Sequence, residues 1–255
     1  MAITMGFEGR SLLPVLGHLR PDQLERLHVQ DYIAARRKAG RKDGTIWTEL
    51  GHLRTSLRWA VDNRMIDHAP KIERPPKPAP KDRWLTKSEA RRLIEAADAL
   101  HIALAIRLML ATAGRVGAIL DLTWDRVVFD RGEIDLRADA TGPRKGRARV
   151  PMNAGVRKAL EEARKVALSE YVIEWNGKQV ASIKTGFNKA VTRSQLHSVT
   201  PHVLRHSAAV WMASEGVAME KIAQYLGHSN VSVTFSTYAR FAPDHLREES
   251  EILDI

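Results

Sequence analysis

The sequence contains no cysteine and no long apolar run, and each absence excludes a class of protein. Without cysteine, the chain of 255 residues forms no disulfide and offers no thiol nucleophile or thiolate metal ligand. Its chemistry must come from His, Asp, Glu, Ser, Thr, Lys and Tyr. The weak apolar stretch over residues 11–19 is interrupted by Pro14 and lacks a basic leader. We therefore expect a soluble, cytoplasmic protein with no membrane partner.

Acidic residues are too few to balance the basic ones. The chain holds 40 Lys and Arg against 30 Asp and Glu, a formal charge of +10 with a pI near 10.0. Clustered basic side chains bind polyanions by releasing condensed counterions, which favours nucleic acid, although an anionic membrane surface fits the charge as well. Residues 244–255 differ, with one Arg against five acids. This tail is acidic and also contains several apolar residues, so we expect it to avoid DNA and to dock on protein.

The N-terminal part of the chain is predicted to be a small helical module, residues 1–69. Residues 44–63 carry an amphipathic stripe with spacings of three and four, which predicts a helix with a basic opposite face. An earlier helix is predicted from Pro21 to about Lys38. The residues expected to turn inward are Leu24, Leu27, Tyr32 and Ile33 in the first helix, and Ile46, Leu50, Leu53, Leu57 and Val61 in the second.

A connector is predicted over residues 70–82, where five prolines alternate with basic residues. This composition favours an extended, semi-rigid segment, so the domain boundary is placed there. Directly after it, Thr86 and Glu89 have the spacing of a capping box, and Leu85 and Ala90 that of a hydrophobic staple. We expect a helix to begin at Lys87.

Residues 83–243 are predicted to form a second domain that is mainly helical. An apolar helix is expected near residues 102–113, strand-like pieces near 126–136 and 148–152, and helices from there to the end. The glycine- and proline-containing run 140–149 is expected to be the turn between the strand pieces. The fold class is therefore mainly α with a small antiparallel β-sheet.

Four short motifs stand out in this second domain. They are TAGR at residues 112–115, RKGR at 144–147, HVLRH at 202–206 and LGH at 226–228, followed by Tyr238 ten residues after His228. In this order and spacing they resemble the tyrosine recombinase (phage integrase) family, whose pattern is Arg, Lys, His-x-x-Arg, His and Tyr. The resemblance covers about residues 83–243, and the module before the connector looks like the family's helical core-binding domain, which is SAM-like.

The residue types also suit cleavage of a phosphodiester on chemical grounds. A tyrosine such as Tyr238 can attack phosphorus and conserve the bond energy in a covalent intermediate, so that no ATP is needed. Arg115 and Arg205 can each donate two parallel hydrogen bonds to phosphate oxygens. Arg205 lies in an apolar helical stretch where an unpaired charge is costly, and a phosphate partner is expected there. The alternatives are a packed tyrosine and ordinary surface arginines.

The remaining positions complete the site that the resemblance implies. His202, three residues before Arg205, is expected to accept or relay the tyrosine proton, and His228 to donate to a phosphate oxygen. Lys145 is expected to protonate the 5′ oxygen, the alternative being a solvated basic hairpin. His206 is interpreted as structural. No cofactor or metal is expected, since Val203 stands where a zinc-protease helix has Glu.

One position departs from the family pattern. Three residues after the first Arg the family commonly has Glu, whereas this chain has Ala118. An acidic partner for Arg115 is therefore missing, or Asp121 substitutes for it.

The resemblance implies a C-shaped clamp on double-stranded DNA, a homotetramer on two crossover sites and docking of the tail on a neighbouring protomer. A DNA-bending accessory protein is a further possible partner, and the implied location is the nucleoid in the cytoplasm. No module is recognised before residue 21, and the helical module looks short. We expect either a minimal recombinase or one that lacks helices needed for full grip on DNA.

Two other readings of the same residues remain open. A catalytically silent DNA-binding regulator can keep the fold, but all six catalytic positions are filled here, and a silent protein has no need to retain them together. A type IB topoisomerase uses nearly the same residues with little choice of DNA sequence. The small basic module, the catalytic domain and the acidic tail together favour the recombinase.

Overall fold

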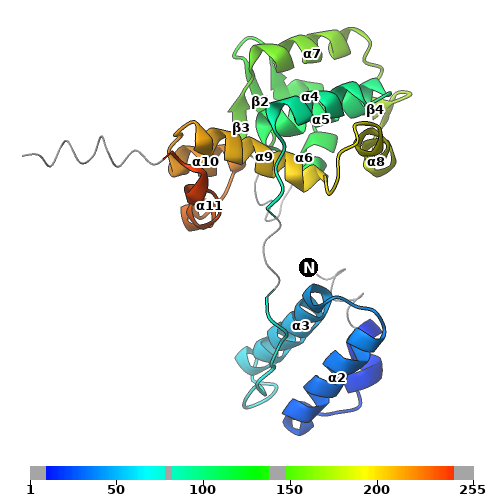
Figure 1. Cartoon of the computed structure of the whole chain (residues 1–255), viewed down its shortest axis with the longest axis vertical. Coiled ribbons are helices and arrows are strands. Elements are labelled where there is room, and N and C mark those ends of the chain that lie inside the picture. The colour runs from blue at the N-terminus through cyan, green and yellow to red at the C-terminus, as the bar shows by residue number, and fades with distance from the viewer. Residues whose placement is uncertain (1–9, 78–81, 138–147, 244–255) are drawn as a thin grey trace, which may run out of the picture. The chain divides into compact units, whose positions relative to one another are not determined.

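The computed structural model describes residues 10–77, 82–137 and 148–243. The chain divides into two compact units, residues 1–81 and 82–255 (Figure 1). No helix in the described ranges is both long and apolar enough to cross a membrane.

The first unit is a small bundle of helices. In chain order they are a helix over residues 10–16, the short 3-10 turn η1 (Pro21–Gln23), α2 (Arg26–Lys38) and α3 (Asp43–Asp62). The predicted stripe of α3 is confirmed, because Ile46, Leu50 and Leu57 are buried in the core of this unit. Amphipathic periodicity alone therefore located this helix to within one residue at each end.

The start and the inward face of α2 differ from the prediction. Pro21 begins only the short turn η1, the chain is extended at Leu24, and α2 begins at Arg26. Leu27, expected inside, is 61% exposed, whereas Val29 is 1% exposed. The reason is helical spacing: Val29 lies three residues before the buried Tyr32 and shares its face, whereas Leu27 lies five residues before it and points away.

Two further segments join the core of the first unit. Leu12 and Leu16, four residues apart on the helix over residues 10–16, are both buried against it, so sequence inspection missed a helix before residue 21. Ile72 of the proline-rich connector is also buried there, and Arg74 lies 4.0 Å from the centre of the Trp47 ring. The packed first unit thus continues beyond residue 69.

A buried carboxylate ties α2 to α3. Glu49 is 3% exposed and accepts hydrogen bonds from the Tyr32 hydroxyl at 2.8 Å and from Nε of Arg36 at 3.0 Å. Nη2 of Arg36 contacts the same carboxylate. Burial, with the Glu49 carboxylate, raises the pKa of Tyr32 well above its usual value, so the phenol stays a neutral donor.

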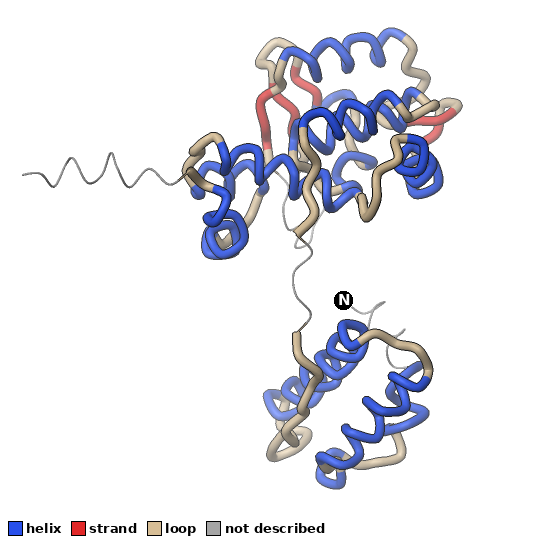
Figure 2. Tube along the Cα trace, viewed as in Figure 1, coloured by secondary structure: helices blue, strands red, loops and turns tan. Residues whose placement is uncertain are grey.

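The second unit carries the elements of the predicted catalytic domain. Its helices and strands are α4 (Lys87–Glu95), α5 (Leu100–Thr112), α6 (Val116–Leu120), η2 (Trp124–Arg126), β1 (Val127–Val128), β2 (Glu133–Asp135), β3 (Arg149–Pro151), α7 (Ala154–Lys165), β4 (Glu174–Trp175), β5 (Lys178–Gln179), α8 (Lys184–Arg193), α9 (Pro201–Ser214), α10 (Met219–Leu226), α11 (Val231–Tyr238) and η3 (Ala239–Phe241). Figure 2 shows how few residues are in strands. The predicted fold class is confirmed.

The capping box predicted for α4 is present. The backbone N–H of Glu89 donates to Oγ1 of Thr86 at 3.1 Å, and the backbone N–H of Thr86 donates to the Glu89 carboxylate at 2.8 Å. Leu85 and Ala90, the predicted staple, are both buried. The helix begins at Lys87, as expected.

The small sheet also agrees with the strand-like pieces of the sequence. Strands β1, β2 and β3 are antiparallel in that order, with Ile134 paired to Val150. Beyond the strands, the N–H of Leu136 donates to the carbonyl of Ala148 at 3.0 Å. The segment between these two residues joins β2 to β3 in the sequence. Lys145 belongs to that segment and lies outside the described residues.

We predict that Glu49→Ala loosens the first unit. The change leaves the Tyr32 hydroxyl and the Arg36 guanidinium without their shared acceptor, which should lower the free energy of opening α2 and α3 by about 2–3 kcal/mol. Hydrogen-exchange mass spectrometry of peptides from these helices measures this opening. The matched control is Asp43→Ala, which removes the exposed ion pair to Arg37 and should leave exchange unchanged. Equal protection in both variants would contradict the role of Glu49.

Candidate active site

Arg205 lies at the centre of the candidate site and joins two helix ends. It projects from α9 with 3% of its surface exposed. Its Nη1 donates to the carbonyl of Ala113 at 2.7 Å, and its Nη2 donates to the carbonyl of Leu226 at 2.8 Å. These carbonyls stand at the C-terminal ends of α5 and α10, where helix carbonyls lack a partner within the helix. The guanidinium therefore satisfies both ends at once.

Both helix ends are shaped by left-handed residues. Ala113 has φ 49° and Gly227 has φ 64°, so the chain turns sharply after α5 and after α10. A Cβ at Gly114 would come within 2.9 Å of side-chain atoms of Thr112 and Ile119, which only glycine avoids. This close turn places Arg115 directly before α6, on the surface.

His228 follows Gly227 and completes the shell around Arg205. Its Nε2 lies 3.0 Å from Nη2 of Arg205, and its Nδ1 lies 2.8 Å from Oγ1 of Thr234. A guanidinium can only donate, so Nε2 must accept. A neutral His228 consequently carries its proton on Nδ1 and donates it to Thr234, which is fully buried on α11.

Tyr238 is the last residue of α11, and its hydroxyl points at a histidine. The side chain is 6% exposed. Its hydroxyl oxygen lies 3.4 Å from Nδ1 of His206, and the two rings are 5.3 Å apart at 37°. Thus the contact of the phenol oxygen within the described part of the chain is with His206, one turn along α9 from His202.

The side chains of the site are largely buried, and its two arginines make it positively charged. Burial lowers the pKa of Arg205 to about 10, with the charge of Arg115 acting in the same direction, and the group stays protonated near neutral pH. Burial also lowers the pKa values of His202 and His228, and the charges of both arginines add to this effect. Burial raises the pKa of the Tyr238 phenol, and the charge of Arg205 opposes that rise. The histidines and the phenol are therefore neutral at rest.

Five of the six predicted residues come together in this cluster. They are Arg115, His202, Arg205, His228 and Tyr238. The sixth, Lys145, lies outside the described residues. Sequence inspection missed Thr234 as the partner of His228, and no pattern in the sequence marks it. It also did not indicate the contact of His206 with Tyr238, and the interpretation of His206 as structural stays a prediction.

The burial of Arg205 has a different explanation from the one expected. A phosphate partner was expected to justify a charge inside an apolar helix, yet two backbone carbonyls and His228 already accept from it. These bonds use three of the five guanidinium N–H groups, so two remain to meet an anion. Position 118, where the family commonly has Glu, holds a buried Ala118, and the Asp121 carboxylate accepts a bond from Gln179 at 3.4 Å. That Asp121 serves Arg115 stays a prediction.

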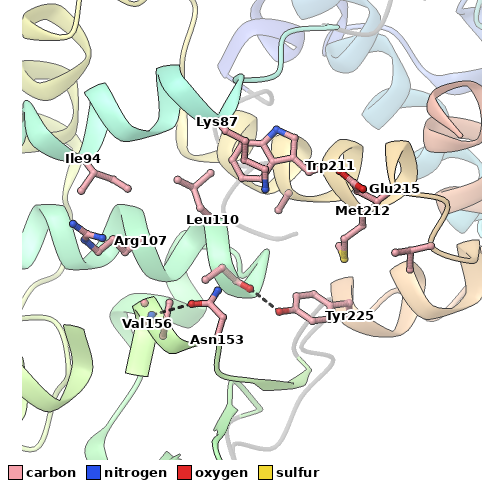
Figure 3. A pocket seen from close by; sticks show the side chains of 14 residues that line it. Lys87, Ile94, Arg107, Leu110, Asn153, Val156, Trp211, Met212, Glu215 and Tyr225 are labelled. Carbon is pink, nitrogen blue, oxygen red and sulfur yellow. Dashed lines mark hydrogen bonds between the residues drawn. The ribbon is translucent and has the colours of Figure 1, made fainter. Parts of the chain in front are cut away.

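A separate cavity of about 440 Å³ lies beside α9 (Figure 3). Trp211 and Met212 line it from α9, and Tyr225 closes one side by donating from its hydroxyl to the carbonyl of Ala111 at 2.6 Å. None of the six predicted catalytic residues lines it. The cluster around Arg205, rather than this cavity, is therefore the candidate active site.

Comparison with known families identifies the chain. The model of the phage integrase family matches residues 83–245, more than half of the chain. The chain belongs to the phage integrase family. The match covers most of the second unit, including the described cluster, so the resemblance to the family is confirmed.

Relatives in this family include tyrosine recombinases. The chain is 30% identical over 191 residues to tyrosine recombinase XerA of Pyrococcus horikoshii, a match that covers 72% of this chain and 65% of the relative. It is 27% identical over 227 residues to XerA of Thermococcus kodakarensis, covering 86% of this chain and 79% of the relative. The match to the first relative thus spans slightly less than two thirds of its length.

Solved structures share the fold of this phage integrase family member. The Tn1549 transposon integrase in complex with transposon right end DNA superposes with a TM-score of 0.78 at 19% identity, covering 98% of this chain and 93% of that one. A lambda integrase tetramer bound to a Holliday junction gives a TM-score of 0.74 at 17% identity, covering 95% and 72%. At these identities the likeness concerns the fold alone.

The lowered pKa values of the histidines make the stability of the second unit depend on pH. Unfolded histidine titrates near 6.5, and His202, His206 and His228 bind protons less readily when folded. Their stabilisation is complete above pH 6.5, decreases as the pH falls below that value, and is lost once the pH is below the folded pKa values. We predict a lower Tm near pH 5.5 than near pH 7.5, measured by calorimetry.

One substitution measures how much of this pH-dependent fall in Tm is due to His228. In His228→Gln, the amide oxygen can still accept from Arg205 but does not titrate, so the fall in Tm between the two pH values should be smaller. The exposed His197→Gln is the control and should keep the wild-type fall. An unchanged fall in His228→Gln would mean that His228 is not held neutral by Arg205.

Proposed function

We propose that this protein is a site-specific DNA recombinase that cleaves and rejoins DNA through a 3′-phosphotyrosine intermediate, without metal or ATP. The observation that carries the proposal is the cluster itself: in a member of the phage integrase family, a tyrosine phenol feels the charge of a buried, doubly anchored arginine with spare donors. A phosphodiester held by that arginine would lie within the electrostatic reach of the nucleophile. Binding to DNA would place the protein at the nucleoid.

The phosphate is proposed to be held by Arg115, Arg205 and His228. Arg205 offers its two remaining N–H groups, and Arg115, exposed at the start of α6, offers a planar guanidinium. His228, neutral at rest, can turn its Nδ1–H from Thr234 to a phosphate oxygen. Together these donors would stabilise the charge of the pentacoordinate transition state, which is typically the largest single contribution to such catalysis.

The proton balance assigns the remaining roles. The oxygen of Tyr238 bonds to phosphorus as the bond from phosphorus to the 5′ oxygen breaks. The phenolic proton passes to His202, whose lowered pKa keeps it neutral and able to accept. Lys145 gives a proton to the 5′ oxygen. Reversal of these steps with a second 5′ hydroxyl rejoins the strand.

Binding of DNA is proposed to use both units. In the first unit, Arg54 and Arg58 lie on the exposed face of α3 beside Trp59, which is 58% exposed, and this face suits a DNA backbone. Residues 1–69 would then be a core-binding domain joined by residues 70–82 to the catalytic domain, residues 83–243. A homotetramer on DNA, docking of residues 244–255 on a neighbour and a DNA-bending accessory protein belong to the same proposal.

We predict that a covalent adduct with DNA forms in the wild type and not in Tyr238→Phe. The purified protein is incubated with fragmented DNA from its source genome, SDS is added, and DNA-linked protein is quantified and the linked DNA sequenced. Removal of the hydroxyl removes the nucleophile, so adduct should fall to background. Recurrence of one sequence among the linked fragments is expected for a recombinase.

Other outcomes would select the alternatives. Adducts at many unrelated sequences would favour a type IB topoisomerase. Folded, DNA-binding wild type without adduct would favour a silent regulator. An adduct that persists in Tyr238→Phe would mean that a residue other than Tyr238 is the nucleophile.

We predict that Lys145→Ala slows cleavage of ordinary DNA but not of DNA with a 5′-bridging sulfur. The site found by sequencing is synthesised in both forms, and single-turnover cleavage is timed. Loss of a general acid should slow the ordinary substrate by about 10²–10⁴-fold. A thiolate leaves without a proton, so the sulfur substrate should restore the rate.

The neighbouring Arg147→Ala is the matched control. It removes a positive charge from the same segment and should slow both substrates alike, if at all. Rescue by sulfur in Arg147→Ala, and none in Lys145→Ala, would give the role of the acid to Arg147.

A further inference from the structure

Among the described residues, His206 is the histidine whose contact with Tyr238, the proposed nucleophile, is seen. It is 9% exposed on α9, with Nδ1 at 3.4 Å from the Tyr238 hydroxyl oxygen. Its ring also meets Phe241 of η3, with centres 6.2 Å apart and nearly perpendicular planes. The roles proposed above use His202 and His228 and leave this contact unexplained.

The other nitrogen of His206 determines which tautomer is present. Nε2 is buried and has no hydrogen-bond partner among the described residues. A neutral imidazole carries one N–H and one lone pair, and a buried N–H without a partner is among the rarest features of folded proteins. The proton therefore belongs on Nδ1, where the phenol oxygen can accept it.

Burial, more than the surrounding charges, keeps the ring of His206 neutral by lowering its pKa. Asp82 favours its protonation, whereas His202 and Arg240 oppose it, and burial lowers its pKa below the usual value. Asp82 and Arg240 also form an ion pair with each other, so their effects on the ring partly cancel. A neutral ring with one donor at Nδ1 is the state that results.

We propose that His206 is a further catalytic residue, whose Nδ1–H donates to the phenolic oxygen of Tyr238. Because that donor occupies a lone pair of the oxygen, the hydroxyl proton is directed away from His206. The same hydrogen bond stabilises the negative charge that develops as the oxygen attacks phosphorus. No proton passes through His206. The inference rests on the proposed function, in which Tyr238 is the nucleophile.

Two substitutions distinguish the effect of the Nδ1–H donor of His206 from the effect of its ring packing. His206→Phe keeps a ring against Tyr238 and Phe241 but removes the donor. His206→Asn keeps an N–H at the position of Nδ1, since both atoms are three bonds from Cα, but it loses the ring. A purely structural role predicts that Phe is the better replacement, whereas the donor role predicts that Asn is.

The measurement is the initial rate of covalent adduct formation with fragmented genomic DNA at neutral pH. We expect His206→Phe to be roughly 10- to 100-fold slower than wild type, the usual loss for a hydrogen bond to a charged oxygen, and His206→Asn to be several-fold faster than His206→Phe. The matched control is His101→Phe, a histidine stacked on Trp175 with centres 5.0 Å apart, which should be unchanged. Tm and DNA binding are measured for each variant.

A wild-type rate in His206→Phe, or a rate in His206→Asn equal to or below that in His206→Phe with both variants folded, would overturn the proposal. Long-range ¹H–¹⁵N NMR of the histidine rings is the second measurement and needs no DNA. It should show His206 protonated on Nδ1 near pH 7, and protonation on Nε2 would overturn the proposal. If the wild type forms no adduct, the proposed function fails on that result, while the tautomer is still decided by NMR.

Discussion

The geometry of the site depends on a single buried guanidinium. Arg205 spans the carbonyl of Ala113 at the end of α5 and that of Leu226 at the end of α10. A charge with 3% exposure is tolerated because these acceptors replace its lost hydration. Arg115 follows the first helix end by two residues, and His228 follows the second by two. The same bonds that satisfy Arg205 therefore fix the positions of Arg115 and His228, the other proposed phosphate-binding residues.

The sequence predicted the elements of the fold better than the contacts between them. Periodicity located α3, and the capping box located the start of α4, because both signals are local and involve side chains. The partners of Arg205 are backbone carbonyls, which every residue possesses, so no motif indicates them. Thr234 was missed for a related reason: its contact to His228 depends on the packing of α10 against α11, not on the spacing of the residues.

The errors in the first unit have local causes. Pro21 and the hydrophobic Leu27 suggested a longer α2, but the chain is extended at Leu24, and the inward face is set by Val29 and Tyr32. The helix over residues 10–16 was overlooked because Pro14 was taken as an interruption. A proline removes one backbone donor from a helix, and the burial of Leu12 and Leu16 on one face offsets that loss.

Tyr238, the proposed nucleophile, lies on a helix with few buried side chains of its own. Val233 and Phe235 of α11 are 52% and 59% exposed, and Tyr238 is one of only two buried residues of this helix. The following turn η3 is held by the start of the second unit instead, through the ion pair of Arg240 with Asp82 and the edge contact of Phe241 with Trp84 at 5.1 Å. Segments with few buried apolar contacts open at low cost. The proposed phosphate-binding groups are thus fixed by the core helices, whereas Tyr238, the proposed nucleophile, is held by few contacts. This arrangement would let the phenol move without disturbing the proposed phosphate site.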